Sequence, residues 1–170
     1  MAHKIFILAV LVATFANDGS SKPLISSKCP TYWTAFGDSC YRFFGQHLNL
    51  KDASFNCRIH GSRGRFAYLV SIHSQEENDF VATLVKSSTD PEDENAHIWI
   101  GLNDEVEEGN FAWSDGTDLD FTEWFPGQPS GGPSQQGVIM RGPREDDFSF
   151  WHDDTAGTRY YYVCKLPQFD

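Results

Sequence analysis

The sequence predicts a single α+β domain. Two amphipathic helical segments lie in the first half of the chain, short apolar strand-like segments follow, and four cysteines are spread over 170 residues. A chain of this length buries one core of ordinary size. Aromatic residues make up 15% of the sequence, which favours a packed core over disorder. We therefore expect two helices packed on small antiparallel sheets, with a long loop region.

The N-terminus has the features of a secretory signal peptide over residues 1–16. Lys4 precedes an apolar run that extends from Ile5 to Ala16, and its small final residue suits a cleavage site. The run is shorter than the roughly 20 residues that a membrane-spanning helix needs. Residues 17–28 are small and polar, which predicts a mobile lead-in to a domain over residues 29–167. We therefore expect a secreted, extracellular protein with no membrane anchor.

An even number of cysteines in an oxidising compartment predicts disulfide bonds. Three pairings of Cys29, Cys40, Cys57 and Cys164 are formally possible. The short segment between Cys29 and Cys40 can form a hairpin, which favours a local Cys29–Cys40 bond and leaves Cys57 with Cys164. The second bond would close most of the domain into one loop and would be its main covalent constraint.

The first predicted helix covers residues 50–60. Asn49 is a suitable N-cap, and Gly61 is a suitable residue at which to end the helix. Its apolar positions fall on one face, as expected for a helix packed on a core. They are Leu50, Ala53 and Cys57.

The second predicted helix begins at a capping box. In Ser74-Gln75-Glu76-Glu77 the serine can accept from a backbone N–H, and the glutamate can reach back to the cap. An apolar stripe follows at helical spacing. It consists of Phe80, Val81, Leu84 and Val85.

Strand signals dominate after the second helix, so we expect helices first and strands later. Residues 98–102 and 111–113 read as short strands, the second followed by a turn. All twelve residues of 126–137 are Pro, Gly, Ser or Gln, which predicts a long loop without apolar anchors. Residues 148–151 and 159–165 look like a closing strand pair.

Together these segments resemble the C-type lectin-like domain, over residues 29–167. The resemblance implies a double-loop fold in which a long loop holds calcium and, in true lectins, a sugar. The family pairs its first two cysteines as a hairpin and the next with the last, which agrees with the pairing above. The motifs that carry it are Cys29-Pro30 with Trp33, Ser39-Cys40-Tyr41, Cys57, Trp99-Ile100-Gly101-Leu102-Asn103-Asp104, Trp113-Ser114-Asp115-Gly116, Trp124 before Gln128-Pro129, Trp151 with Asp153, and Val163-Cys164.

The resemblance also places the family's principal calcium site, and here the sequence departs from the family. The matching positions are Gln128, Pro129, Ser130, Gln135 or Gln136, His152 and Asp153. Only Asp153 carries a full negative charge, whereas calcium takes six to eight oxygen ligands that normally include several carboxylates. A neutral imidazole at His152 is a poor ligand for calcium. We therefore expect calcium binding to be weak or absent.

The family's auxiliary calcium site is half kept, because Asp104 and Glu108 match it while its loop partners fall on small or amide residues. With Asp153, these two are the candidate metal ligands. The Gln128-Pro129 pair resembles the galactose-type variant of the lectin loop. The expected glycan contacts are Gln128, Ser130, Gln135, His152 and Asp153.

Charge and missing motifs exclude other functions. Asp and Glu outnumber Lys and Arg by 24 to 13, and the net charge of −11 would repel a nucleic acid. The sequence lacks the common nucleophile, zinc-protease and phosphate-loop motifs, so we expect no enzymatic activity. The simplest interpretation of the acidic residues is a solvated surface. The alternative is a mineral-binding matrix protein, similar to the lectin-domain spicule matrix proteins of echinoderms.

Overall fold

The computed structural model describes residues 28–168, so the predicted signal peptide (1–16) and nearly all of the lead-in (17–28) lie outside the described residues. No helix among residues 28–168 is long and apolar enough to span a membrane. The elements in chain order are β1 (Thr34–Phe36), β2 (Ser39–Leu48), α1 (Leu50–Ile59), β3 (Tyr68–Leu69), α2 (Gln75–Ser88), β4 (Ile98–Asn103), β5 (Ala112–Trp113), β6 (Gly137–Met140), β7 (Trp151–Asp154) and β8 (Tyr160–Pro167).

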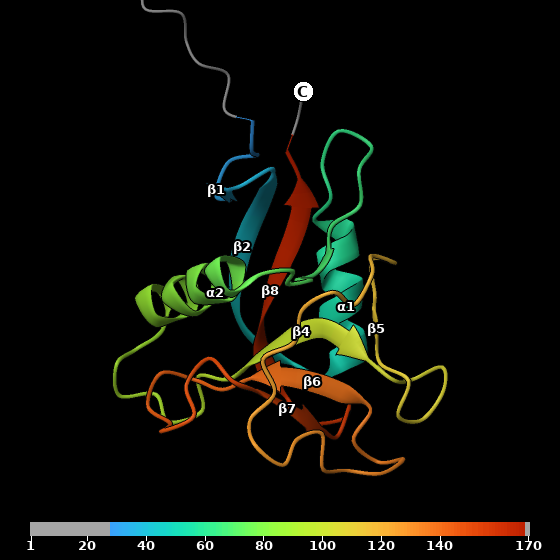
Figure 1. The fold of residues 1–170 in the computed structure, drawn as a ribbon. Coiled ribbons are helices and arrows are strands. Elements are labelled where there is room, and N and C mark those ends of the chain that lie inside the picture. Colours follow the sequence, from blue (N-terminus) through green and yellow to red (C-terminus); the bar gives the residue numbers. More distant parts are fainter. Residues whose placement is uncertain (1–27, 169–170) are drawn as a thin grey trace, which may run out of the picture.

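The strands form one connected sheet in the order β1-β2-β8-β4-β6-β7, with β3 added to β8 and β5 added to β4 (Figure 1). The pairing of β4 with β8 is parallel and the other pairings are antiparallel. The predicted α+β class with two helices is confirmed. The sheet, however, is single and mixed rather than several small antiparallel sheets, because the β4–β8 pairing joins its two halves.

Two predictions about the strands are wrong. The helices do not come first, because the β1–β2 hairpin precedes both of them. The two C-terminal strands do not pair with each other either: β7 pairs with β6, while β8 pairs with β2, β3 and β4. β6, a fully buried strand directly after the polar loop, was not predicted from the sequence. β6 lies between β4 and β7, and β8 lies between β2 and β4 in the middle of the sheet.

The first helix is confirmed. The Asn49 side chain accepts a hydrogen bond from the Asp52 backbone N–H at 2.9 Å, and this satisfies one of the unpaired donors of the first turn. The predicted apolar face, Leu50, Ala53 and Cys57, is the buried face.

The second helix is confirmed, but its capping box is only half formed. Ser74 Oγ accepts from the Glu77 backbone N–H at 3.1 Å. The Glu77 carboxylate does not return to the N-cap residue: one oxygen accepts from the His73 N–H at 2.8 Å, and the other from Lys165 Nζ at 2.6 Å and the Tyr41 hydroxyl at 2.5 Å. The Lys165 side chain is only 15% exposed, and a cation so far removed from water requires an anionic partner.

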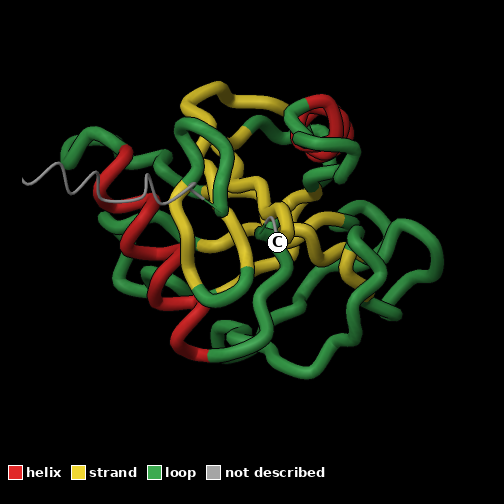
Figure 2. Tube along the Cα trace, turned by 90° about the horizontal axis from the view of Figure 1, so that it is seen from above, coloured by secondary structure: helices red, strands yellow, loops and turns green. Residues whose placement is uncertain are grey.

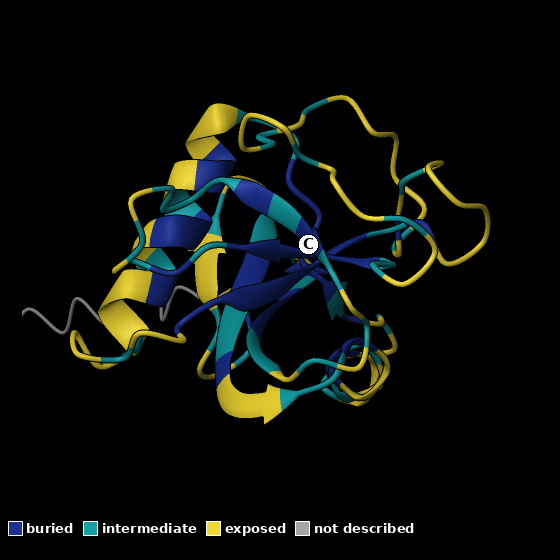
Figure 3. Cartoon of the chain, turned by 90° about the horizontal axis from the view of Figure 1, so that it is seen from below, coloured by how far each residue is buried: buried dark blue, intermediate teal, exposed yellow. Residues whose placement is uncertain are grey.

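Strand β8 separates two hydrophobic clusters. Successive side chains of a strand point to opposite faces, so Tyr162, Cys164 and Leu166 pack in the cluster beside α1 while Val163 packs in the cluster beside α2. The helices accordingly lie on opposite sides of the strands (Figure 2). Figure 3 shows the central strands buried and the outer faces of the helices exposed.

The expected disulfide pairing is confirmed. Cys29 is bonded to Cys40 across 11 positions of sequence, and Cys57 of α1 is bonded to Cys164 of β8 across 107 positions. The first bond closes the N-terminal hairpin, and the second ties a helix to the central strand.

The two bonds should differ in their contribution to stability. In the chain-entropy model, the 107-position closure contributes about 4.8 kcal/mol at 25 °C and the 11-position closure about 2.8 kcal/mol. We therefore predict that Cys57→Ala/Cys164→Ala lowers the free energy of unfolding, measured by urea denaturation, by more than Cys29→Ala/Cys40→Ala does. The second variant is the matched control because its cysteines are also buried. Equal losses of unfolding free energy in the two double variants would contradict the role of loop closure.

Candidate functional site

Asp153 of β7 holds the 126–137 loop against the sheet. Its Oδ1 accepts from the Ser130 N–H at 2.9 Å and its Oδ2 from the Gly131 N–H at 2.7 Å. The Gln135 side-chain amide donates to the Asp153 main-chain oxygen at 3.4 Å. The sequence predicted a loop without apolar anchors. The loop is nevertheless anchored, because its backbone N–H groups bind Asp153.

The position of Asp153 follows from the alternation of β7. Trp151 and Asp153 are buried, whereas His152 and Asp154 are partly exposed. Asp153 is only 6% exposed, and a carboxylate removed from water needs strong donors. Two backbone N–H groups supply them, as charge-assisted hydrogen bonds. The carboxylate is therefore stabilised by the loop itself.

His152 is held by two contacts beside the loop. Its ring stacks on Phe125, with centroids 5.2 Å apart and an interplanar angle of 17°. Its Nε2 lies 2.5 Å from an Asp147 carboxylate oxygen, and both side chains are more than four-fifths buried. His152 therefore faces an acidic side chain.

The side-chain oxygen of Gln128, Oε1, is buried and has no hydrogen-bond partner. Among the described residues of this loop it is the only side-chain N or O atom of that kind. Its backbone N–H donates to the Phe125 oxygen at 2.8 Å, and the Gln128–Pro129 peptide bond is cis. A buried amide oxygen without a donor is costly. This oxygen is thus an unsatisfied acceptor buried within the loop.

The five expected glycan-contact residues therefore lie in one region. Ser130 and Gln135 contact Asp153 directly, and Gln128 and His152 both contact Phe125.

The two other candidate metal ligands lie on the segment after β4. Asp104 is 4% exposed; its Oδ2 accepts from the Gly109 N–H at 2.9 Å, and its Oδ1 is buried without a partner. Its own N–H donates to the Gln136 oxygen at 3.2 Å, so this segment borders the loop. Glu108 is exposed.

The arrangement of these residues bears on calcium binding. Among residues 28–168 no three His, Cys, Asp or Glu side chains gather as a metal-binding group. At the principal position the single carboxylate, Asp153, has both oxygens engaged by backbone donors. That arrangement does not fit a calcium ion. The assignment of Asp104, Glu108 and Asp153 as weak calcium ligands stays a prediction.

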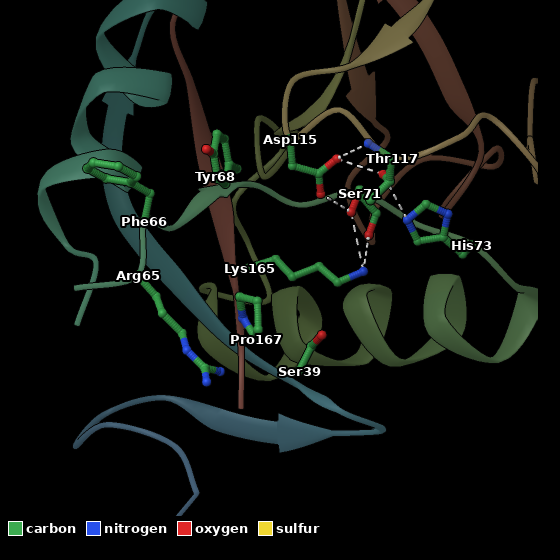
Figure 4. A pocket seen from close by; sticks show the side chains of 10 residues that line it. All are labelled: Ser39, Arg65, Phe66, Tyr68, Ser71, His73, Asp115, Thr117, Lys165 and Pro167. Carbon is green, nitrogen blue, oxygen red and sulfur yellow. Dashed lines mark hydrogen bonds between the residues drawn. The ribbon is translucent and has the colours of Figure 1, made fainter. Parts of the chain in front are cut away.

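A hollow of about 430 Å³ lies beside the C-terminal half of β8, away from the 126–137 loop (Figure 4). We call it the β8 pocket. No sequence motif predicted it, because its lining residues are distant from one another in sequence. Its lining residues are Ser39, Arg65, Phe66, Tyr68, Ser71, His73, Asp115, Thr117, Lys165 and Pro167.

Asp115 is the fixed carboxylate of the β8 pocket. Burial alone would raise its pKa, but hydrogen bonds from the Ser71 hydroxyl (2.6 Å) and from the Thr117 N–H and hydroxyl (3.0 and 2.6 Å) hold the pKa below its usual value. Asp115 is therefore ionised at neutral pH.

Comparison with known proteins places the chain in a family. The family model described as "Lectin C-type domain" matches residues 46–166. The chain belongs to the C-type lectin domain family. Its members are non-enzymatic binding proteins, and the expectation of no enzymatic activity agrees with this.

The similar proteins include echinoderm lectins. The chain is 38% identical over 152 residues to echinoidin of Heliocidaris crassispina, covering 84% of this chain and 99% of echinoidin. It is 37% identical over 161 residues to the "Alpha-N-acetylgalactosamine-specific lectin" of Patiria pectinifera, covering 92% of each. The crystal structure of the C-type lectin CEL-I from Cucumaria echinata superimposes with a TM-score of 0.73 at 33% identity, covering 82% of this chain and 98% of CEL-I.

The anchoring role of Asp153 leads to a prediction about loop exchange. In Asp153→Asn a single amide oxygen replaces two carboxylate oxygens, so at least one of the bonds to Ser130 and Gly131 is lost. Since a hydrogen bond to a charged group contributes about 1.5–3 kcal/mol, hydrogen exchange of these amides should quicken about tenfold or more. Mass spectrometry of the exchanged loop peptide measures it.

The matched control is Asp146→Asn, which removes the same charge from an exposed position near β7. It should leave exchange in the loop unchanged. Equal exchange in the wild type and Asp153→Asn would show that another contact holds the loop.

Proposed function

We propose that this protein is a secreted C-type lectin that binds galactose-type sugars through the 126–137 loop and β7, with a weak or absent requirement for calcium. The observation that carries the proposal is the pair of hydrogen bonds from the loop backbone to Asp153. They hold Ser130 and Gly131 against β7 without requiring an ion.

The choice of sugar rests on the loop sequence and one acceptor. Gln128-Pro129 resembles the galactose-type form of the family's loop, and a relative that shares 37% of its residues with this chain is named as specific for α-N-acetylgalactosamine. The Gln128 Oε1 is buried without a donor. If the Gln128 side chain turns outward, a sugar hydroxyl supplies that donor.

The weak calcium requirement follows from competition for Asp153. A calcium ion at the principal site would have to displace two backbone N–H groups from the carboxylate. In return it would gain only one charged ligand, where it prefers several. Asp104, which has one buried oxygen without a partner, is the more suitable ligand for a weakly held ion.

The proposed compartment is extracellular. Residues 1–16 have the pattern of a signal peptide, and two disulfide bonds suit an oxidising environment. The proposed partners are glycans of that environment.

A mineral-matrix function is the second candidate, favoured by the exposure of acidic side chains before and after β5. A dispersed negative surface attracts divalent cations without forming one defined site. The exposed residues are Glu105, Glu107, Glu108, Asp118 and Asp120.

Sugar retention tests the proposal. The protein should be retained on galactose–agarose in the presence of a calcium chelator, and free galactose should release it whereas mannose should not. Gln128→Ala should abolish retention, because it removes the acceptor. Gln75→Ala, at an exposed position on α2, is the control and should be retained.

Loss of retention with the chelator would refute the weak calcium requirement. Absence of retention combined with salt-sensitive adsorption to calcium carbonate would refute the lectin proposal and favour the matrix function.

Restoring the family's ligands should restore calcium binding. Ser130→Asn, Gln135→Glu and His152→Asn together add one carboxylate and two amide oxygens beside Asp153, which should raise calcium affinity about tenfold or more. Calorimetry of the wild type and the triple variant measures it. An unchanged affinity would show that ligand loss is not what weakens the site.

A further inference from the structure

The β8 pocket has a preassembled polar wall. The Ser71 hydroxyl links Lys165 Nζ (3.3 Å) to an Asp115 oxygen (2.6 Å), and the Thr117 hydroxyl continues the chain from Asp115 (2.6 Å) to His73 Nε2 (3.2 Å). The Asp115 carboxylate receives three hydrogen bonds, whereas two carboxylate oxygens together can accept about four. A fixed, partly exposed acceptor therefore remains for a ligand.

Another part of the pocket lining is aromatic. Phe66 is 57% exposed and Tyr68 is partly exposed, and both line the hollow. The Arg58 guanidinium lies 5.2 Å from the Phe66 ring centroid and 5.7 Å from that of Tyr68, and these cation–π contacts hold both rings. Figure 4 shows the two rings to the left of Asp115, with Ser71 and Thr117 to the right of it and the Lys165 side chain below.

The charges favour an uncharged ligand. Lys165 Nζ donates to Glu77 (2.6 Å), to the Ser71 main-chain oxygen (3.0 Å) and to the Ser71 hydroxyl (3.3 Å), so its three donors are in use and its charge is paired. The Arg65 guanidinium donates to the Gln168 main-chain oxygen. The lining therefore carries charges of both signs: Asp115 would repel an anion, and the Arg65 guanidinium would repel a cation.

We propose that the β8 pocket is a second binding site, which takes an uncharged pyranose ring without calcium. A pyranose has an apolar C–H face that matches an aromatic wall and hydroxyl groups that match a carboxylate acceptor. A volume of about 430 Å³ accommodates one or two such rings. Another hollow, of about 300 Å³ and lined by Leu50, Lys51, Ser54, Leu69, Asn103, Glu105 and Ser114, contains no aromatic side chain.

This site is separate from the loop. None of the five expected glycan contacts of the loop lines the β8 pocket. The inference therefore does not rest on the proposed function, and either can fail without the other.

The test is an NMR titration of the whole secreted chain, labelled with nitrogen-15, in the presence of a chelator. The probes are methyl β-D-galactopyranoside and methyl α-D-mannopyranoside. At least one should cause saturable shifts of the Phe66, Tyr68 and Thr117 amides. Phe66→Ala should weaken this binding about tenfold, as expected for loss of an aromatic contact.

Matched variants separate the contact from folding and from the loop. Phe55→Ala removes an equally exposed phenylalanine of α1 that lies outside the pocket, and should leave binding unchanged. Asp115→Asn should weaken binding, whereas Asp118→Asn, at an exposed position, should not. Asp153→Asn should alter the loop and leave the pocket shifts intact.

The inference is overturned if neither probe shifts the pocket amides, or if the shifts are confined to residues 126–137. It is also overturned if Phe66→Ala and Phe55→Ala bind equally well. Phe66 is exposed, so Phe66→Ala should fold normally. It therefore tests the inference even if Asp115→Asn fails to fold.

Discussion

Two adjacent residues of β8 fix the architecture on both faces of the sheet. Cys164 is bonded to Cys57 and so holds α1, while Lys165, which points the opposite way, pairs with Glu77 at the start of α2. The same strand pairs with β2, β3 and β4. A covalent bond and a largely buried ion pair thus place both helices against a shared strand, and the loops are built on this frame. The ion pair with Glu77 also neutralises the charge of Lys165, which lines the β8 pocket.

The 126–137 loop binds the Asp153 carboxylate through its own backbone. In a metal site, a cation offsets the charges of the carboxylates that surround it. Here one carboxylate remains, and two backbone N–H groups compensate it. Glycine suits position 131, because a Cβ there would collide with Gln135. The loop lacks the acidic ligands of the family's calcium site, and its backbone instead binds the one carboxylate that is present, Asp153.

Local rules predicted the parts of the fold that local chemistry determines. Asn49 and Ser74 begin helices because their side chains accept backbone N–H groups nearby in sequence, and the hairpin favoured the Cys29–Cys40 bond. The placement of β6 between β4 and β7, and of β8 in mid-sheet, depends on contacts distant in sequence. The resemblance located Asp153 and its neighbours, but it could not show that the carboxylate binds backbone. The β8 pocket joins residues from 39 to 167, and no single motif contains it.

The central claim is that the Asp153 carboxylate serves the loop rather than a cation. The most direct measurement is the carbon-13 chemical shift of its carboxyl carbon, followed by NMR as calcium is added to the wild-type protein. The account predicts that this shift stays constant while exposed carboxylates show only small, non-saturating changes. A saturable shift of the Asp153 carboxyl carbon at micromolar calcium, accompanied by loss of the Ser130 and Gly131 hydrogen bonds, would contradict it.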